Sequence, residues 1–185
     1  MLACRAEENG VVLEVYYEEC PENPRKRDNL GTMVCWHRRY RLGDRHNFAT
    51  PGDFTNYVTT ELKGQVLMQP LYLLDHSGLV MSTAPFNDPW DSGQVGWIYV
   101  TKDRVRNGLG VKRITAPVRA WAMSILEAEV ELYNHYLSGE VFWYMLRAGN
   151  EVIDSCGGFY GSDFRQNGMA EYLPPEYQHL VDMLE

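Results

Sequence analysis

The sequence predicts an α+β domain in which a mainly antiparallel sheet packs against one long helix. Segments with strand character come in pairs joined by short turns. Only one stretch, from about Thr115 to Leu137, carries a long apolar stripe at helical spacing. A doubly wound parallel sheet would need regular alternation of strands and helices, which this chain lacks. Because no long linker and no internal repeat interrupts it, we treat residues 1–185 as a single domain.

In the first half of the chain, residue type and turn signals mark two strands, a helix and a hairpin. The runs 11–17 and 32–36 are rich in β-branched and aromatic residues and predict strands. Thr50 predicts the start of a helix, because a proline follows it and an aspartate stands three residues later. Residues 66–83 predict a hairpin, since two apolar runs flank the turn signal at 75–78.

The second half predicts a short basic helix, the long helix, and a second hairpin. Residues 96–100 form a strand, and Thr101 then caps the basic helix. After the long helix, strands at 140–147 and 151–156 flank a Gly-Asn turn. Two prolines at 174–175 open a last amphipathic helix.

One acidic residue interrupts the apolar stripe of the long helix. We place Glu129 at the edge of the stripe, because Glu127 and Glu131 bracket it and a small rotation exposes it. If Glu129 is buried instead, Arg119 or Arg147 is the expected partner.

Charge is distributed unevenly along this acidic chain, whose formal net charge is −8. Residues 25–45 hold seven Lys/Arg and two Asp, a net of +5, and residues 101–119 hold six Lys/Arg and one Asp, again +5. An acidic surface with basic islands favours a charged protein partner over nucleic acid, whose contact would be secondary. The alternative is that the islands pair with the acids of the chain itself.

Several classes of protein are excluded by composition. No apolar run approaches the roughly 20 residues of a membrane span, and the first residues do not resemble a secretory signal. The four cysteines show no CxxC pair, so we expect reduced thiols and neither a bound metal nor a cofactor. These observations predict a protein of the cytoplasm that has no membrane contact.

Three segments join Asp or Ser to Gly and are the candidates for chemistry: 75–78, 89–96 and 154–161. Ordinary turn chemistry explains such sequences. Alternatively, the segments converge at one end of the sheet and form a nucleophile, a base and an orienting carboxylate. The candidate residues of such a catalytic site are His76, Asp91, Ser92 and Cys156. A divalent metal on Asp75, His76 and Asp91 is a further alternative, but neither site has a characteristic spacing, so we assign no catalytic or metal residue.

The segment from His37 to His46 interleaves aromatic and cationic side chains. That pattern suits phosphate contact combined with stacking, and as a strand it would place Arg38 and Tyr40 on one face. The alternative is a solvated strand end. The basic segment and the Gly-bearing segments together supply the residues that we expect to bind a partner: Arg38, Arg39, Tyr40, Arg41, Trp90, Asp91 and Tyr160.

Four blocks resemble one family, that of small proteins encoded by phages and mobile elements of gut bacteria. The blocks are residues 29–40, 70–78, 89–100 and 154–161. The resemblance covers about residues 28–161 and departs at Gly157, where a Trp is expected. The family is taken to include inhibitors of the Cas9 nuclease, the type II-A anti-CRISPR proteins, and it offers no catalytic residues to carry over.

The resemblance implies a counter-defence protein that binds Cas9 or its guide RNA complex stoichiometrically, in the cytoplasm of a bacterial host. The charge islands and aromatic loops agree with recognition by a surface. Two alternatives remain: a small cysteine- or metal-dependent enzyme using Asp75, His76, Asp91 and Cys156, and a non-catalytic phage accessory protein.

Overall fold

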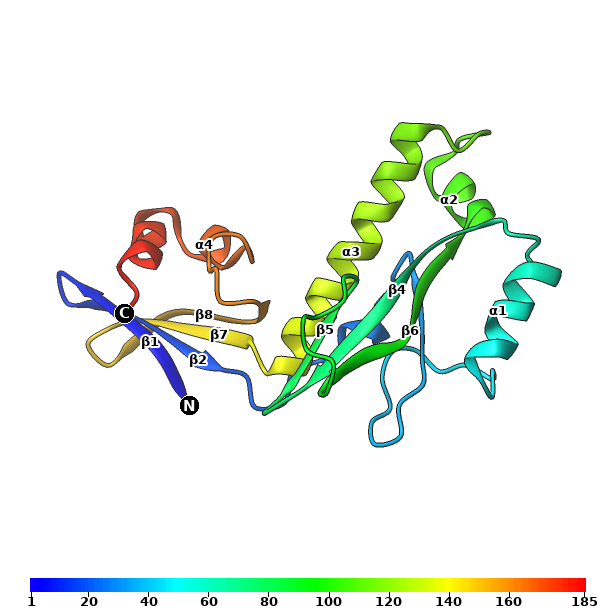
Figure 1. The fold of residues 1–185 in the computed structure, drawn as a ribbon. Coiled ribbons are helices and arrows are strands. Elements are labelled where there is room, and N and C mark those ends of the chain that lie inside the picture. The colour runs from blue at the N-terminus through cyan, green and yellow to red at the C-terminus, as the bar shows by residue number, and fades with distance from the viewer. The chain divides into compact units, whose positions relative to one another are not determined.

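A computed structural model describes residues 1–185 as helices and two four-stranded antiparallel sheets (Figure 1). The α+β class is therefore confirmed, although one sheet was expected and two are found. The residues group into two compact units, residues 1–23 with 135–185 and residues 24–134. No helix is both long enough and apolar enough to cross a bilayer.

The sheet of the first unit is built from two hairpins that pair through their inner strands. Its strands, in spatial order, are β1 (Leu2–Glu8), β2 (Val11–Tyr17), β7 (Val141–Ala148) and β8 (Glu151–Tyr160). Asn9 and Gly10 both have positive φ, 53° and 80°, as a type I′ hairpin turn requires. The sequence predicted β2 and the β7–β8 hairpin. It did not predict β1, whose charged residues hide its strand character, and β8 runs to Tyr160 rather than ending at Cys156.

Short C-terminal helices complete the core of the first unit. They are α4 (Met169–Tyr172) and η2 (Pro175–Met183). Leu173, Leu180 and Val181 pack with buried sheet residues such as Leu13 and Tyr144. The last helix was correctly expected at the double proline, but it is a 3-10 helix, and α4 was not predicted because it spans a single turn.

The second unit is a sheet with helices on both faces. Its elements in chain order are η1 (Pro24–Lys26), β3 (Thr32–Cys35), α1 (Pro51–Thr60), β4 (Val66–Asp75), β5 (Leu79–Ser82), β6 (Ser92–Thr101), α2 (Lys102–Leu109) and α3 (Ala116–Ser138), of which the last four residues belong to the first unit. The strand order is β3-β6-β4-β5. The predicted capping box is present, because the Thr50 hydroxyl accepts from Asp53 N and the Asp53 carboxylate accepts from Thr50 N.

Alternate residues of the central strand β6 face different helices. Ile98 is fully buried and approaches α3, since a Cβ added at the adjacent Gly31 would meet both Ile98 and Leu126. On the other face, Phe54 of α1 packs against Trp97 and Tyr99, with ring centroids 5.6 and 5.1 Å apart. This alternation is the period of two that a strand covered on both faces must show.

The placement of Glu129 at the edge of the α3 stripe is wrong. The Glu129 side chain is only 11% exposed, and its Oε2 accepts a hydrogen bond from Arg25 Nη1 at 2.9 Å. The Arg25 side chain is itself only 3% exposed. The same guanidinium binds Asp44 with two nitrogens, at 3.0 and 2.7 Å. Neither Arg119 nor Arg147 is the partner, and Arg147 pairs with Glu14 instead. The network joins the loop before β3 to the long helix.

Candidate functional site

The end of the β4–β5 hairpin and the loop before β6 form one hydrogen-bonded, solvent-exposed tip of the second unit. Asp88 Oδ1 accepts from the backbone N of Trp90 and of Asp91, at 2.9 and 3.0 Å. Asp75 N in turn donates to Asp91 O at 2.8 Å. The hydrogen bonds of Asp88 close a turn, and the bond between Asp75 and Asp91 holds that turn, with Trp90, beside the hairpin.

We call the side chains gathered here the tip cluster: Arg39, Tyr40, Asp75, His76, Trp90 and Asp91. His76 Nδ1 lies 2.7 Å from Asp91 Oδ2, and the two side chains are 67% and 44% exposed. The pKa of His76 is raised, first by the hydrogen bond that the imidazole donates to the Asp91 carboxylate and then by the negative charge of that carboxylate. The pKa of Asp88 is lowered by the two backbone N–H groups that it accepts. Two of the three candidate segments are thus brought together.

The basic segment reaches the tip through Arg39. Its guanidinium forms an ion pair with Asp75 and lies 5.4 Å from the centroid of the Tyr40 ring. His37 stacks on Tyr40 at 5.1 Å, and its Nδ1 accepts from the backbone N of both Arg39 and Tyr40. Residues 37–46 are therefore an ordered loop, not the strand considered from the sequence. Arg38 and Arg41 are exposed there with no ion-pair partner.

Trp90 is the most exposed large hydrophobic side chain of the chain, with 91% of its surface accessible. Its backbone is fixed by Asp88 while its ring is free to contact another molecule. A large exposed aromatic group on a rigid loop is the residue type that anchors protein interfaces.

Neither nucleophile candidate, Ser92 or Cys156, has a histidine as its hydrogen-bond partner. The Ser92 hydroxyl donates to Asp88 O, within the turn. Cys156 belongs to the first unit, where it lies in strand β8 rather than in a loop. A shallow cavity of about 330 Å³ beside it is lined by Glu18, Trp143, Ser155, Cys156 and Gly157, none of which is a histidine. No imidazole lines this cavity, and the acidic side chain beside the thiol there is that of Glu18.

Tyr160 is also a structural residue rather than part of an exposed surface. It is 7% exposed, and its hydroxyl donates to Glu22 O at 2.5 Å. We therefore leave Tyr160 out of the interface that the sequence suggested. Burial of this ring follows from the extension of β8 to residue 160, which the sequence did not predict.

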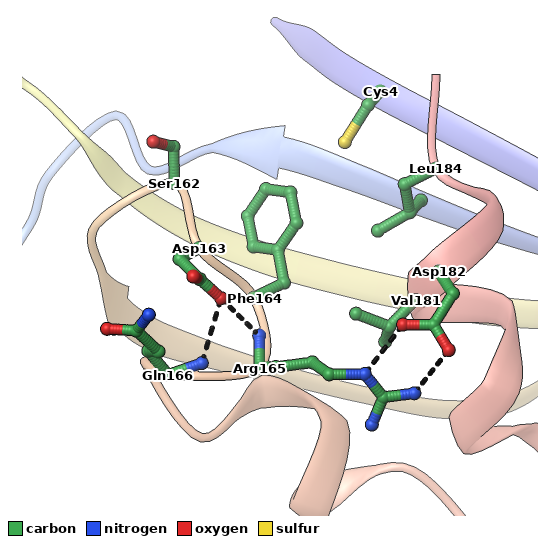
Figure 2. A pocket seen from close by; sticks show the side chains of 9 residues that line it. All are labelled: Cys4, Ser162, Asp163, Phe164, Arg165, Gln166, Val181, Asp182 and Leu184. Carbon is green, nitrogen blue, oxygen red and sulfur yellow. Dashed lines mark hydrogen bonds and ion pairs between the residues drawn. The ribbon is translucent and has the colours of Figure 1, made fainter.

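A cavity of about 790 Å³ in the first unit is lined by charged groups that pair with one another (Figure 2). Arg165 binds both carboxylate oxygens of Asp182, at 2.6 and 2.5 Å. Asp163 Oδ1 accepts from the backbone N of Arg165 and of Gln166. The thiol of Cys4 faces this cavity, and burial raises its pKa, so it is a neutral thiol rather than a nucleophile.

No group of three or more His, Cys, Asp or Glu side chains is placed to hold a metal ion. The set considered from the sequence is divided between two pairs, since Asp75 binds Arg39 and His76 binds Asp91. Sequence reasoning missed Asp88, although an Asp two residues before a Trp in a Pro- and Gly-bearing loop is a recognisable turn signal.

No family model matches the chain, and neither a curated protein nor a solved structure is significantly similar to it.

Proposed function

We propose that this chain is a stoichiometric binding protein that engages its partner through the tip cluster. The partner that we propose is a host CRISPR nuclease, Cas9, or its complex with guide RNA, as the resemblance of the four sequence blocks implies. The observation that carries the binding role is Trp90, 91% exposed on a loop whose backbone is fixed by hydrogen bonds.

The composition of the tip cluster supports recognition. Tryptophan, tyrosine and arginine are the residue types enriched among the side chains that dominate binding energy. Here Trp90, Tyr40 and Arg39 occur together, and the last is already oriented by Asp75. A surface whose loops are ordered before binding loses little conformational entropy when the partner docks.

The chemistry of the same residues argues against turnover. The His76–Asp91 pair is open to water, and the only hydroxyl of the turn, that of Ser92, is occupied by a backbone carbonyl. Covalent catalysis needs a side-chain nucleophile within hydrogen-bond reach of the imidazole, and the Ser92 hydroxyl donates elsewhere. The cysteine or metal enzyme is therefore the weaker alternative.

The test is a titration of purified Cas9–guide RNA complex with the protein, read as residual DNA cleavage. We expect inhibition to saturate near an equimolar ratio. Trp90→Ala should weaken binding by at least about 30-fold, because loss of an interface anchor costs about 2 kcal/mol or more. Trp121→Ala is the matched control, since Trp121 is 41% exposed on α3, outside the tip cluster.

Each outcome has a definite meaning. Full inhibition at a ratio far below one would indicate catalysis and overturn the binding role. No inhibition by the native protein would remove Cas9 as the partner and leave the phage accessory protein as the explanation. Equal losses in the Trp90 and Trp121 variants would remove the tip cluster from the interface.

A further inference from the structure

A second cavity, in the second unit, is lined by cations from three successive segments. It has a volume of about 590 Å³ and lies where the start of β4, helix α2, the loop after α2 and the first turn of α3 meet. Half of its ten lining residues are basic: Lys102, Arg106, Lys112, Arg113 and Arg119. Its volume is within the range of about 300–1,000 Å³ that is usual for small-ligand sites.

Local structure fixes where these cations lie. Thr101 caps α2, and Lys102 N donates to Gln65 O at 2.9 Å, which ties the start of α2 to the start of β4. Val105 is fully buried and holds the helix against its unit. Gly110 ends α2 in the left-handed conformation, with φ of 64°, and turns the chain back toward α3.

The acids of the chain leave this charge largely unbalanced. Among the five cations only Arg106 has a carboxylate partner, Asp103 at 2.5 Å. Neighbouring Arg104 is directed to Asp28 and to the Asn29 carbonyl. The other four lining cations form no ion pair.

Four unpaired like charges around one hollow produce a positive potential even in a protein of net charge −8. Their mutual repulsion is relieved when an anion enters. The first turn of α3 adds to this potential, because the helix dipole favours negative charge there. Thr115 and Gln65 add neutral hydrogen-bond donors to the lining.

We propose that this cavity binds the phosphates of an oligophosphate anion, whether a free polyphosphate or the backbone of a polynucleotide. Phosphate fits the residues present, because the planar guanidinium groups of Arg113 and Arg119 match its geometry and a lysine supplies a compact positive charge. The site shares no residue with the tip cluster, so it does not depend on the proposed function.

The experiment measures binding of inorganic tripolyphosphate by calorimetry and of a fluorescein-labelled ten-nucleotide single-stranded RNA by anisotropy, both at low salt. The test variant is Arg113→Gln with Arg119→Gln. The matched control is Lys26→Gln with Arg45→Gln, which removes the same charge from two exposed cations outside the cavity. Circular dichroism establishes that both variants are folded.

We expect the test variant to lose about tenfold in affinity for each cation removed, and the control to lose less than about threefold. Affinity for the native protein should fall as salt rises. Tighter binding of RNA than of tripolyphosphate would identify a polynucleotide as the source of the phosphates, and the reverse a free polyphosphate. If neither probe binds, or if both variants lose affinity equally, the proposal is overturned. Cas9 takes no part in these measurements, so the result is independent of the nuclease titration.

Discussion

Replacing Glu129 with Gln should destabilise the second unit by about 3 kcal/mol. The Glu129 carboxylate accepts from Leu30 N at 2.6 Å, from Gly31 N at 3.2 Å and from Arg25 Nη1 at 2.9 Å. Hydrogen bonds to a charged group contribute about 1.5–3 kcal/mol and neutral ones about 0.5–1.5 kcal/mol, so neutralising the acceptor removes roughly 1 kcal/mol from each of three bonds. The Arg25 side chain is 3% exposed, so water cannot reach it to replace the lost hydrogen-bond energy.

Unfolding in urea is the assay, because an uncharged denaturant leaves ion pairs unscreened. Tryptophan fluorescence reports on the second unit through Trp36 and Trp97, which lie in its aromatic cluster with centroids 6.0 Å apart. The matched control is Glu131→Gln, an exposed position two residues along the same helix, which should change the unfolding free energy by less than about 0.5 kcal/mol. Equal, small effects of the two substitutions would refute the assignment of Glu129 to a buried network.

Three further predictions concern ionisation and packing. By NMR, His76 should titrate above the ordinary histidine pKa, and Asp91→Asn should return its midpoint toward that value. Because the folded pKa is raised, the small stabilisation from this pair is present at acidic pH and is lost as pH rises through that pKa. A thiol reagent at pH 8 should label exposed Cys20 quickly and Cys35 only after unfolding, since burial raises the pKa of Cys35 to about 12. Gly96→Ala should lower the urea midpoint strongly, because the new Cβ would lie 1.9 Å from a carbonyl oxygen of β3.

Each of these has a result that would contradict it. An unchanged histidine midpoint in the asparagine variant would mean that the carboxylate does not act on the imidazole. Equal labelling rates for the two cysteines in the native protein would mean that the thiol in β3 is accessible. Gly93→Ala is the control for the glycine, since nothing lies within 4 Å of a Cβ added there. If both glycine variants unfold at the same urea concentration, β3 and β6 do not approach each other closely at Gly96.

The candidate site was only partly predictable from the sequence. The segments around His76 and Asp91 were correctly grouped, because Asp, Ser and Gly mark turns and turns gather at strand ends. Cys156 and Tyr160 were expected in a loop, because Gly157 and Gly158 resemble one, but the backbone there continues as a strand with an irregular register. The partner of Asp75 was not predictable, since Arg39 reaches it from a loop 36 residues earlier.

Elements whose causes are local were predictable from the order of the residues alone. The Thr50 capping box, the strand 11–17 and the ends of α2 follow from residues within a few positions of one another. Tertiary packing, in contrast, sets the pairing of β2 with β7 and the division of the strands into two sheets. It also decided that Glu129 is buried against Arg25, 104 residues away along the chain. The physical reason is that capping and periodicity act through neighbouring backbone groups. Strand pairing and burial of a charge instead depend on which distant surfaces exclude water together.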